Sequence, residues 1–231
     1  LSLFAEGAST GPESYTITTP IDIKRITGLR IDVLQDNRLP KGGPGRAENG
    51  NLHLAEIDLQ WFPENAQQAT PMKISRATAD FNQDGWTSAH AIDSDPKTAW
   101  AIYPEVNKSH HIVFEFDQPI EAPSGGKLAI TLKHLPPVHL IGRFKLFATD
   151  AAGEGVNLQP GGDPSPHVFH AVGQRVGQFQ IGRRPGFLHV VAGDGDGVEA
   201  GHLGAGEGEN VRHDPHGRAR RIDVRVADHE L

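Results

Sequence analysis

The feature that most limits the possible folds is an alternation of apolar and polar residues with a period of two, repeated along the first 150 residues. Successive side chains of a β-strand point to opposite faces, so this period predicts strands with one buried face. No sustained helical period is present, and only one short helix is expected, at residues 87–92 with Thr87 or Ser88 as its cap. The alternating segments are SYTITTPIDI, ITGLRIDVL, NLHLAEIDLQW, HIVFEFDQPI, KLAITLKHL and IGRFKLFATD.

Turn-forming residues separate these segments. Clusters of Gly, Pro, Asn and Asp bound them, as in PKGGPGRAENGN, NQDG and APSGGK. Several short alternating strands with such turns between them are typical of sandwiches and barrels. We therefore predict an all-β domain over residues 1–150, built as an antiparallel β-sandwich.

The composition changes near residue 150. No lysine follows Lys145, no threonine follows Thr149, and sixteen of the 27 glycines lie after residue 150. We expect residues 151–231 to form a Gly-, His- and Arg-rich tail with little regular structure, apart from two weak strands within 179–193 and 221–228. Out-of-frame translation of a GC-rich gene would give the same composition. A frameshift-derived tail and a genuine disordered tail therefore both stay open.

Charge and cysteine content exclude several classes of function. The net charge of −7 argues against nucleic acid or an anionic membrane as the main partner. The absence of cysteine excludes disulfide scaffolds, zinc–thiolate sites and cysteine nucleophiles. No apolar run is long enough to predict membrane insertion. No signal peptide is visible, and because the chain begins at Leu1, we expect it to be part of a longer protein.

The segment HAIDSDPKTAW, residues 90–100, concentrates oxygen-bearing side chains beside a tryptophan. Calcium in proteins takes about six to eight oxygen ligands. The spacing of Asp93, Asp95 and Thr98 allows an irregular loop to turn all three side chains toward one ion. An ordinary Asp-Pro turn that leads into a core Trp100 explains the same residues. From spacing alone, both interpretations stay open.

This segment resembles the signature of discoidin domains (factor 5/8 type C) and of family-32-like carbohydrate-binding modules, which are galactose-binding-like β-sandwiches. Ser94 replaces the glycine of that signature. The resemblance implies a structural Ca²⁺ ion bound by Asp93, Asp95, Thr98, the carbonyl oxygen of His90, and a glutamate from a neighbouring strand. The segment HLAEIDLQW resembles that strand, and its glutamate is Glu56. The strand precedes the loop here, whereas it usually closes the family's domain. The resemblance therefore implies a discoidin-like jelly roll with a circularly permuted order.

A more specific resemblance covers residues 12–150. The motif GPGRAENGN, the Glu-bearing strand that follows it and the segment ATADF resemble the discoidin-like part of large planctomycete cytochrome-c-like proteins with PSD1, DUF1549 and DUF1553 regions. This resemblance implies a non-catalytic accessory module of an exported protein, in the periplasm or outside the cell. The chain contains no C-x-x-C-H motif, so we expect no covalent heme on it.

Sugar-binding sites combine an aromatic face with hydrogen-bonding side chains. Trp86, Tyr103 and Trp61 are expected to be exposed, and Trp86 and Tyr103 are candidate ligand-binding residues. Trp86 is equally explained as a loop aromatic that folds back onto the sandwich. Trp100 is expected in the core, because its flanks are apolar.

The polar loop GPGRAENGN contributes Arg46 and Asn49 as further candidate ligand-binding residues. Arg46 is suited to binding a carboxylate or sulfate through two hydrogen bonds, although pairing with a surface acid is the alternative. The adjacent His110 and His111 are expected to point to opposite faces of a strand and not to share a metal.

No nucleophile elbow, phosphate-binding loop or metalloprotease motif is present, so we expect no enzyme. The predicted function is a non-catalytic, carbohydrate-binding-like module with a structural calcium loop. The alternative is a structural domain that docks against neighbouring domains of a multidomain cytochrome-c-like protein and has no soluble ligand.

Overall fold

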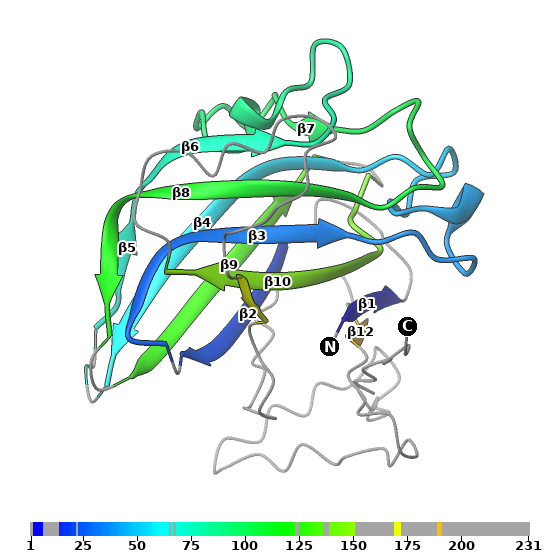
Figure 1. Ribbon diagram of the computed structural model, residues 1–231. Coiled ribbons are helices and arrows are strands. Elements are labelled where there is room, and N and C mark those ends of the chain that lie inside the picture. The colour runs from blue at the N-terminus through cyan, green and yellow to red at the C-terminus, as the bar shows by residue number, and fades with distance from the viewer. Residues whose placement is uncertain are drawn as a thin grey trace, which may run out of the picture.

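The computed structural model describes residues 2–6, 14–21, 23–64, 66, 68–122, 125–135 and 139–150, and the backbone of 169–171 and 189–190. These residues form two antiparallel sheets that share one hydrophobic core (Figure 1). The prediction of an all-β sandwich is therefore confirmed. Of residues 151–231, only the backbone of 169–171 and 189–190 is described. Both hypotheses about the tail therefore concern residues outside the described part of the chain.

The larger sheet contains seven strands, all paired antiparallel. The strand β11 (Phe169–Ala171) pairs with β10 beside the main path. In spatial order the other strands are β12 (His189–Val190), β1 (Leu3–Glu6), β10 (Arg143–Thr149), β3 (Arg25–Val33), β8 (His110–Glu121) and β6 (Ile74–Ala79).

The smaller sheet is also antiparallel, and β4 lies inside it, paired with three other strands. Its strands are β2 (Ser14–Ile21), β9 (Gly126–His134), β4 (His53–Pro63) and β5 (Thr70–Met72), with β7 (Trp100–Ala101) also on β4. Two 3₁₀ helices complete the elements, η1 (Pro40–Gly42) and η2 (Ser88–Ala91). Thr87 caps η2, which confirms the one short helix that the sequence predicts.

The core is formed by the inward positions of both sheets, as the period of two requires. Ile31 of β3 and Phe114 of β8 are fully buried against Ile130 of β9 and Leu59 of β4, which are at most 3% exposed. Each such side chain contributes about 1.5–3 kcal/mol to stability relative to an exposed position. The alternation therefore selects the sandwich because it supplies one apolar face to each sheet.

The tryptophans differ in how well their positions are predicted. Trp100 is fully buried, as expected, and its indole N–H donates a hydrogen bond of 2.9 Å to the carbonyl oxygen of Phe81. The expected exposure of Trp61 is wrong, since only 6% of the residue is exposed. Trp61 continues the inward series of Ile57 and Leu59 on β4, and this phase places the indole in the core.

A β-bulge in β4 changes the phase of its alternation. The pairing with β9 shifts between Leu54 and Glu56, so Ala55 is the extra residue. In the sequence the shift is visible as a three-residue step between the inward positions Leu54 and Ile57. The bulge therefore puts Glu56 on the face opposite the core, where it meets the loop that follows η2.

The short first strand, β1, lies beside β10, which closes the predicted 1–150 domain. In β1, Leu3 faces Phe144 of β10 across an antiparallel pair. This proximity satisfies the geometric condition for a circularly permuted strand order. The discoidin resemblance itself stays a prediction.

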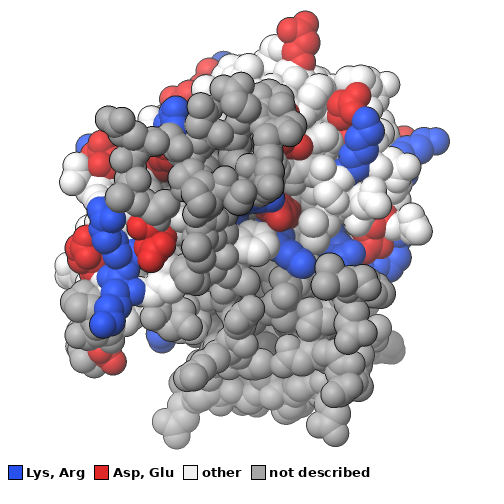
Figure 2. Space-filling model, in the orientation of Figure 1, with Lys and Arg blue, Asp and Glu red and all other residues white. Residues whose placement is uncertain are grey.

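Acidic and basic side chains are interspersed on the face of the molecule that Figure 2 shows. Among the described residues, no helix is long and apolar enough to cross a membrane. The interspersed charges agree with a hydrated surface on that face.

Candidate functional site

In the loop at residues 93–98, the polar side chains form hydrogen bonds with the loop backbone and with each other. Asp93 Oδ1 accepts a hydrogen bond of 2.9 Å from the backbone N–H of Asp95, and Asp95 Oδ1 accepts one of 3.0 Å from Lys97. The hydroxyl oxygen of Thr98 lies 2.8 Å from Asp93 Oδ2 and 3.0 Å from the Asp95 carbonyl oxygen. The loop thus joins the side chains of Asp93 and Thr98, while the Asp95 carboxylate bonds to the loop backbone as in an ordinary Asp-Pro turn. The convergence of all three side chains on one ion stays a prediction.

Ser94 adopts a left-handed backbone conformation, with φ of 65°. A non-glycine residue in this region costs on the order of 1 kcal/mol, and glycine avoids that cost. The discoidin signature that this segment resembles has glycine at this position, whereas Ser94 makes the turn with some strain. Its backbone N–H donates a hydrogen bond to the carboxylate of Glu56.

The carboxyl groups of Glu56 and Asp93 lie within hydrogen-bonding distance of each other. Burial raises the pKa of Glu56, and the nearby Asp93 charge raises it further. Burial also raises the pKa of Asp93, but hydrogen bonds from Asp95 and Thr98 outweigh this effect and the pKa is lowered overall. The loop therefore places two carboxyl groups with opposite pKa shifts against each other.

The oxygen Oε1 of Glu56 is buried and has no hydrogen-bond partner. A cation between Glu56 and Asp93 would satisfy this atom and neutralise the pair, so the donor set fits a hard, oxygen-binding ion such as Ca²⁺. Within the described part of the chain, no three His, Asp or Glu side chains are close enough to hold a metal by themselves. The remaining ligands would have to come from Thr98 and backbone carbonyls. The ring of His90 is already engaged, because its Nδ1 accepts a hydrogen bond of 3.1 Å from the N–H of Thr87. The family resemblance assigns only the backbone carbonyl of His90 as a calcium ligand.

A second cluster lies where β4 begins and consists of three stacked rings. The imidazole of His53 stacks on the indole of Trp86 at 4.6 Å between centroids, with an interplanar angle of 17°. Its other ring contact is with His139, at 3.9 Å and 8°. We call Trp86, His53 and His139 the ring column.

The ring column is uncharged at neutral pH. Burial, with the adjacent His139 as a smaller cause, lowers the pKa of His53 to about 4. Burial also lowers the pKa of His139. Two neutral imidazoles can stack on each other and on an indole without repulsion, which is consistent with their close contact.

Backbone pairing brings the column together from distant parts of the chain. The loop before η2 folds onto β7, because Gln83 N–H donates to Ala101 O at 3.0 Å and Ala101 N–H donates to Trp86 O at 3.3 Å. His53 pairs with Ala101 in the β4–β7 ladder. The N–H of His53 also donates to the carbonyl of His139 at 2.8 Å. Trp86 and His139 are therefore held on either side of His53.

Asn51 holds the neighbouring loop in place. Its Oδ1 accepts hydrogen bonds of 3.1 Å from the backbone N–H groups of Ile102 and Tyr103, and its Nδ2 donates one of 3.1 Å to Gln83 Oε1. Asn51 is only 3% exposed, so its amide serves the structure. Tyr103 is 47% exposed, and among the described residues it is the one large hydrophobic side chain exposed to solvent.

The polar loop with Arg46 and Asn49 packs beside the ring column. The N–H of Arg46 donates to Leu140 O at 2.8 Å. The side-chain oxygen of Asn49 accepts a 3.1 Å hydrogen bond from the N–H of Asn51, so Asn49 shapes the loop. A Cβ on Gly45 would lie 1.8 Å from the carbonyl oxygen of Asn51, so only glycine fits. The conformation of this segment is therefore determined by close backbone packing.

The structure thus groups Trp86 and Tyr103 with four residues that the sequence did not single out as candidates: His53, His139, Asn51 and Gln83. In the sequence, the one feature that points to His53 is its outward position on a strand. Every solvated polar residue of a strand shares that position, so it does not identify a binding residue.

No protein-family model, curated protein or solved structure matches this chain. The candidate site is therefore defined by the geometry of its own residues.

Proposed function

We propose that this chain is a non-catalytic, carbohydrate-binding-like module, an accessory part of a larger exported protein. The observation that carries the proposal is the ring column of Trp86, His53 and His139, with the exposed Tyr103 held nearby by amide side chains. Sugars stack their C–H faces on aromatic rings and exchange hydrogen bonds with nearby polar groups. Both kinds of partner occur together at this end of the sandwich.

We also propose that a structural Ca²⁺ ion pins the loop at residues 93–98. The support is the contact between Glu56 and Asp93 and the buried, unpartnered oxygen of Glu56. The ion would supply positive charge between the two carboxylates. Glu56, Asp93 and Thr98 are proposed to hold it through their side chains, and Asp95 and His90 through their backbone carbonyl oxygens. Its effect would be to lower the cost of ordering the loop.

The alternative of a docking domain without a soluble ligand is less well supported. A surface that docks against another domain usually presents a contiguous apolar patch. Within the described part of the sandwich, Tyr103 is the single large hydrophobic side chain that is exposed. The mixed charges in Figure 2 agree with this observation.

A glycosidase is also less well supported, although Glu56 and Asp93 have pKa values shifted in opposite directions, which is a pattern found in acid–base catalysis. Glycosidases hold their two carboxyl groups roughly 5–9.5 Å apart, so that the sugar or a water fits between them. Glu56 and Asp93 are instead in direct hydrogen-bonding contact. The pair therefore suits a shared cation better than a glycosidic bond.

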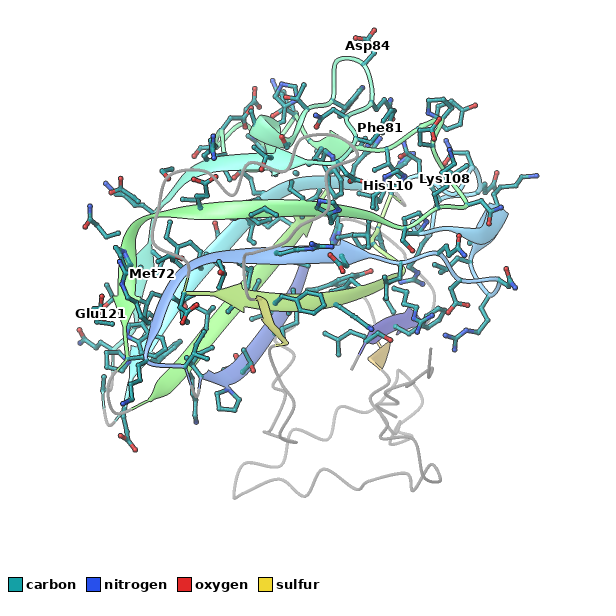
Figure 3. All side chains as sticks on the ribbon, in the orientation of Figure 1. Met72, Phe81, Asp84, Lys108, His110 and Glu121 are labelled. Atoms are coloured by element: carbon teal, nitrogen blue, oxygen red, sulfur yellow. The ribbon has the colours of Figure 1, made fainter. Side chains whose placement is uncertain are left out.

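The calcium proposal is tested by thermal melts of the full chain with Ca²⁺ and with a chelator. At a Ca²⁺ concentration of about 100 times Kd the expected stabilisation is about 2.7 kcal/mol, or roughly 5–10 °C in Tm. Asp93→Ala should abolish the shift. Asp84→Ala, which removes an exposed acid at the tip of a nearby loop (Figure 3), should preserve it. Equal melting temperatures with Ca²⁺ and chelator would overturn the calcium proposal.

Ligand binding is tested separately by screening the full chain on a glycan array. Tyr103→Ala and Trp86→Ala should each lower any binding about 5- to 150-fold, because stacking on an aromatic ring contributes about 1–3 kcal/mol. An array without a single bound glycan would favour the docking domain.

A further inference from the structure

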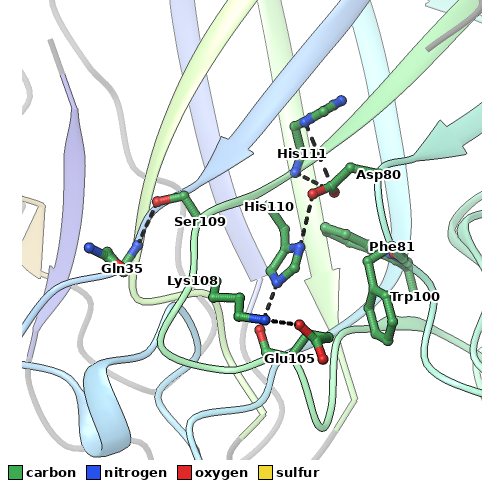
Figure 4. Close-up of polar contacts among 9 residues, drawn as sticks. All are labelled: Gln35, Asp80, Phe81, Trp100, Glu105, Lys108, Ser109, His110 and His111. Carbon is green, nitrogen blue, oxygen red and sulfur yellow. Dashed lines mark hydrogen bonds and ion pairs between the residues drawn. The ribbon is translucent and has the colours of Figure 1, made fainter. Parts of the chain in front are cut away.

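His110 is the first residue of β8 and is only 6% exposed. Its Nδ1 lies 2.9 Å from Asp80 Oδ2, and its Nε2 lies 2.7 Å from the carbonyl oxygen of Glu105 (Figure 4). Asp80 directly follows β6, and Glu105 belongs to the loop that joins β7 to β8. Figure 3 shows that His110, Lys108 and Phe81 gather at the same end of the sandwich, far from Met72 and Glu121. One imidazole thus joins a strand end to a loop.

Hydrogen-bond chemistry determines the protonation state of this ring. A carbonyl oxygen only accepts, so Nε2 must carry a proton to bond Glu105. An ionised carboxylate also only accepts, so Nδ1 must carry one to bond Asp80. Burial raises the pKa of Asp80, but contacts with His110 and with the His111 N–H outweigh it and lower that pKa, so Asp80 is ionised at neutral pH. A ring with protons on both nitrogens is an imidazolium cation.

The other charged groups around the ring are compatible with this state. His111 Nδ1 lies 4.0 Å from Asp80 Oδ1, so both histidines lie near one carboxylate. Burial, together with Arg30, lowers the pKa of His111, which keeps that ring neutral. Lys108 is paired with the Glu105 carboxylate. Burial lowers the pKa of His110, but its bonds to Asp80 and Glu105 raise it overall.

We infer that His110 is a charged clamp that positions the Tyr103 loop, residues 102–109, and releases it when the ring loses a proton. The loop is held at one end by Asn51, which accepts from the N–H of Tyr103. The clamp holds Glu105 two residues further on, and Glu105 N–H closes the turn on Ile102 O at 2.8 Å. His110 is therefore a positioning residue for Tyr103. Any effect of His110 on ligand binding rests on the proposed function. The charge of the His110 ring and its hydrogen bond to the loop do not.

Loss of one proton breaks one of the two bonds. The anionic Asp80 keeps the proton on Nδ1, so Nε2 is left with a lone pair that faces the lone pairs of the Glu105 carbonyl. These two atoms then repel each other, and the loop loses that attachment. We expect the surroundings of the Tyr103 ring to change over the same pH range in which His110 titrates.

NMR of the full chain tests the charge directly. In ¹⁵N-labelled protein at about pH 6.5, where an ordinary histidine is half protonated, both ring nitrogens of His110 should show mainly protonated shifts, because its pKa is raised. A ring that titrates at or below the ordinary histidine value of 6.5 would overturn the inference. Asp80→Asn should lower the pKa of His110 because it removes the facing charge.

Ring-labelled tyrosine tests the hold on the loop. The chain has only two tyrosines, and Tyr15 is 1% exposed in the core, so it serves as an internal reference. Over the pH range in which His110 titrates, the Tyr103 signal should shift with the midpoint of His110 and the Tyr15 signal should not. Asp80→Asn should move that midpoint down. Lys108→Met, which breaks the pairing with Glu105 but leaves its carbonyl, should not.

A Tyr103 signal that stays constant while His110 titrates would refute the clamp. Neither measurement needs a sugar or calcium, so a failure of the proposed function would leave both results interpretable. If a ligand is found, its affinity should fall over the same pH range in the wild type and at lower pH in Asp80→Asn.

Discussion

The stacked His53 makes a quantitative prediction about stability and pH. Its pKa is lowered from 6.5 in the unfolded chain to about 4 in the folded one. Between these values the unfolded state binds more protons, so stability rises with pH across this window and is lost as pH falls. Each pKa unit corresponds to about 1.4 kcal/mol, which gives a maximum of about 2.6 kcal/mol lost between pH 7.5 and 4.5. Because the ring is only half-buried, water reduces this, and we expect about 1–2 kcal/mol.

The perturbation is His53→Phe, which keeps a flat ring in the column and removes the titrating group. Urea unfolding at about pH 7.5 and 4.5 gives, for each protein, the free energy of unfolding that is lost on acidification. The loss in the wild type minus the loss in the variant is assigned to His53, because the other groups titrate equally in both proteins. The wild type should lose about 1–2 kcal/mol more than the variant. Equal losses would show that the column does not hold His53 neutral, and the reasoning about the uncharged ring column would be refuted.

Three further predictions concern the loops around the candidate site. Glu56→Gln should raise stability in chelator by about 0.5–1 kcal/mol, because it removes a charge facing Asp93, and should also abolish any calcium-dependent rise in Tm; a variant that still responds to calcium contradicts this. Gly45→Ala should cost more than about 3 kcal/mol in urea unfolding, because its Cβ would overlap a backbone carbonyl, whereas Gly85→Ala, with nothing within 4 Å, should cost only about 1 kcal/mol. Asn51→Ala should cost about 2–3 kcal/mol and speed hydrogen exchange at the two backbone amides that it accepts from, and unchanged exchange there would argue against its role.

The prediction of the fold succeeds because the strands β2, β3, β4, β8, β9 and β10 each carry their own alternation, whereas β1, β5, β6 and β7 were not predicted. Alternation is local, and the burial of one face per strand leaves few arrangements other than two packed sheets. The short helix after Thr87 and the buried Trp100 follow from equally local patterns. Trp61 is the exception, because its expected exposure ignored the inward phase that Ile57 and Leu59 had already set.

The polar loop at residues 93–98 was predictable in its contacts because its residues are close in sequence. Asp93, Asp95 and Thr98 are within six positions, and an irregular turn necessarily brings their oxygens together. The addition of Glu56 came only from a family resemblance. The structure accounts for it through the β4 bulge, which turns that side chain toward the loop.

The sequence by itself determined the six alternating strands β2, β3, β4, β8, β9 and β10 and, apart from Trp61, which side of each is buried. Only the tertiary structure decided that Trp86, His53 and His139 stack, and that His110 lies between Asp80 and the Glu105 carbonyl. These groups come from strands and loops that are distant in sequence, and they meet through ladder pairing and backbone hydrogen bonds. A pKa depends on burial and on neighbouring dipoles and charges, and both exist only after the chain has folded.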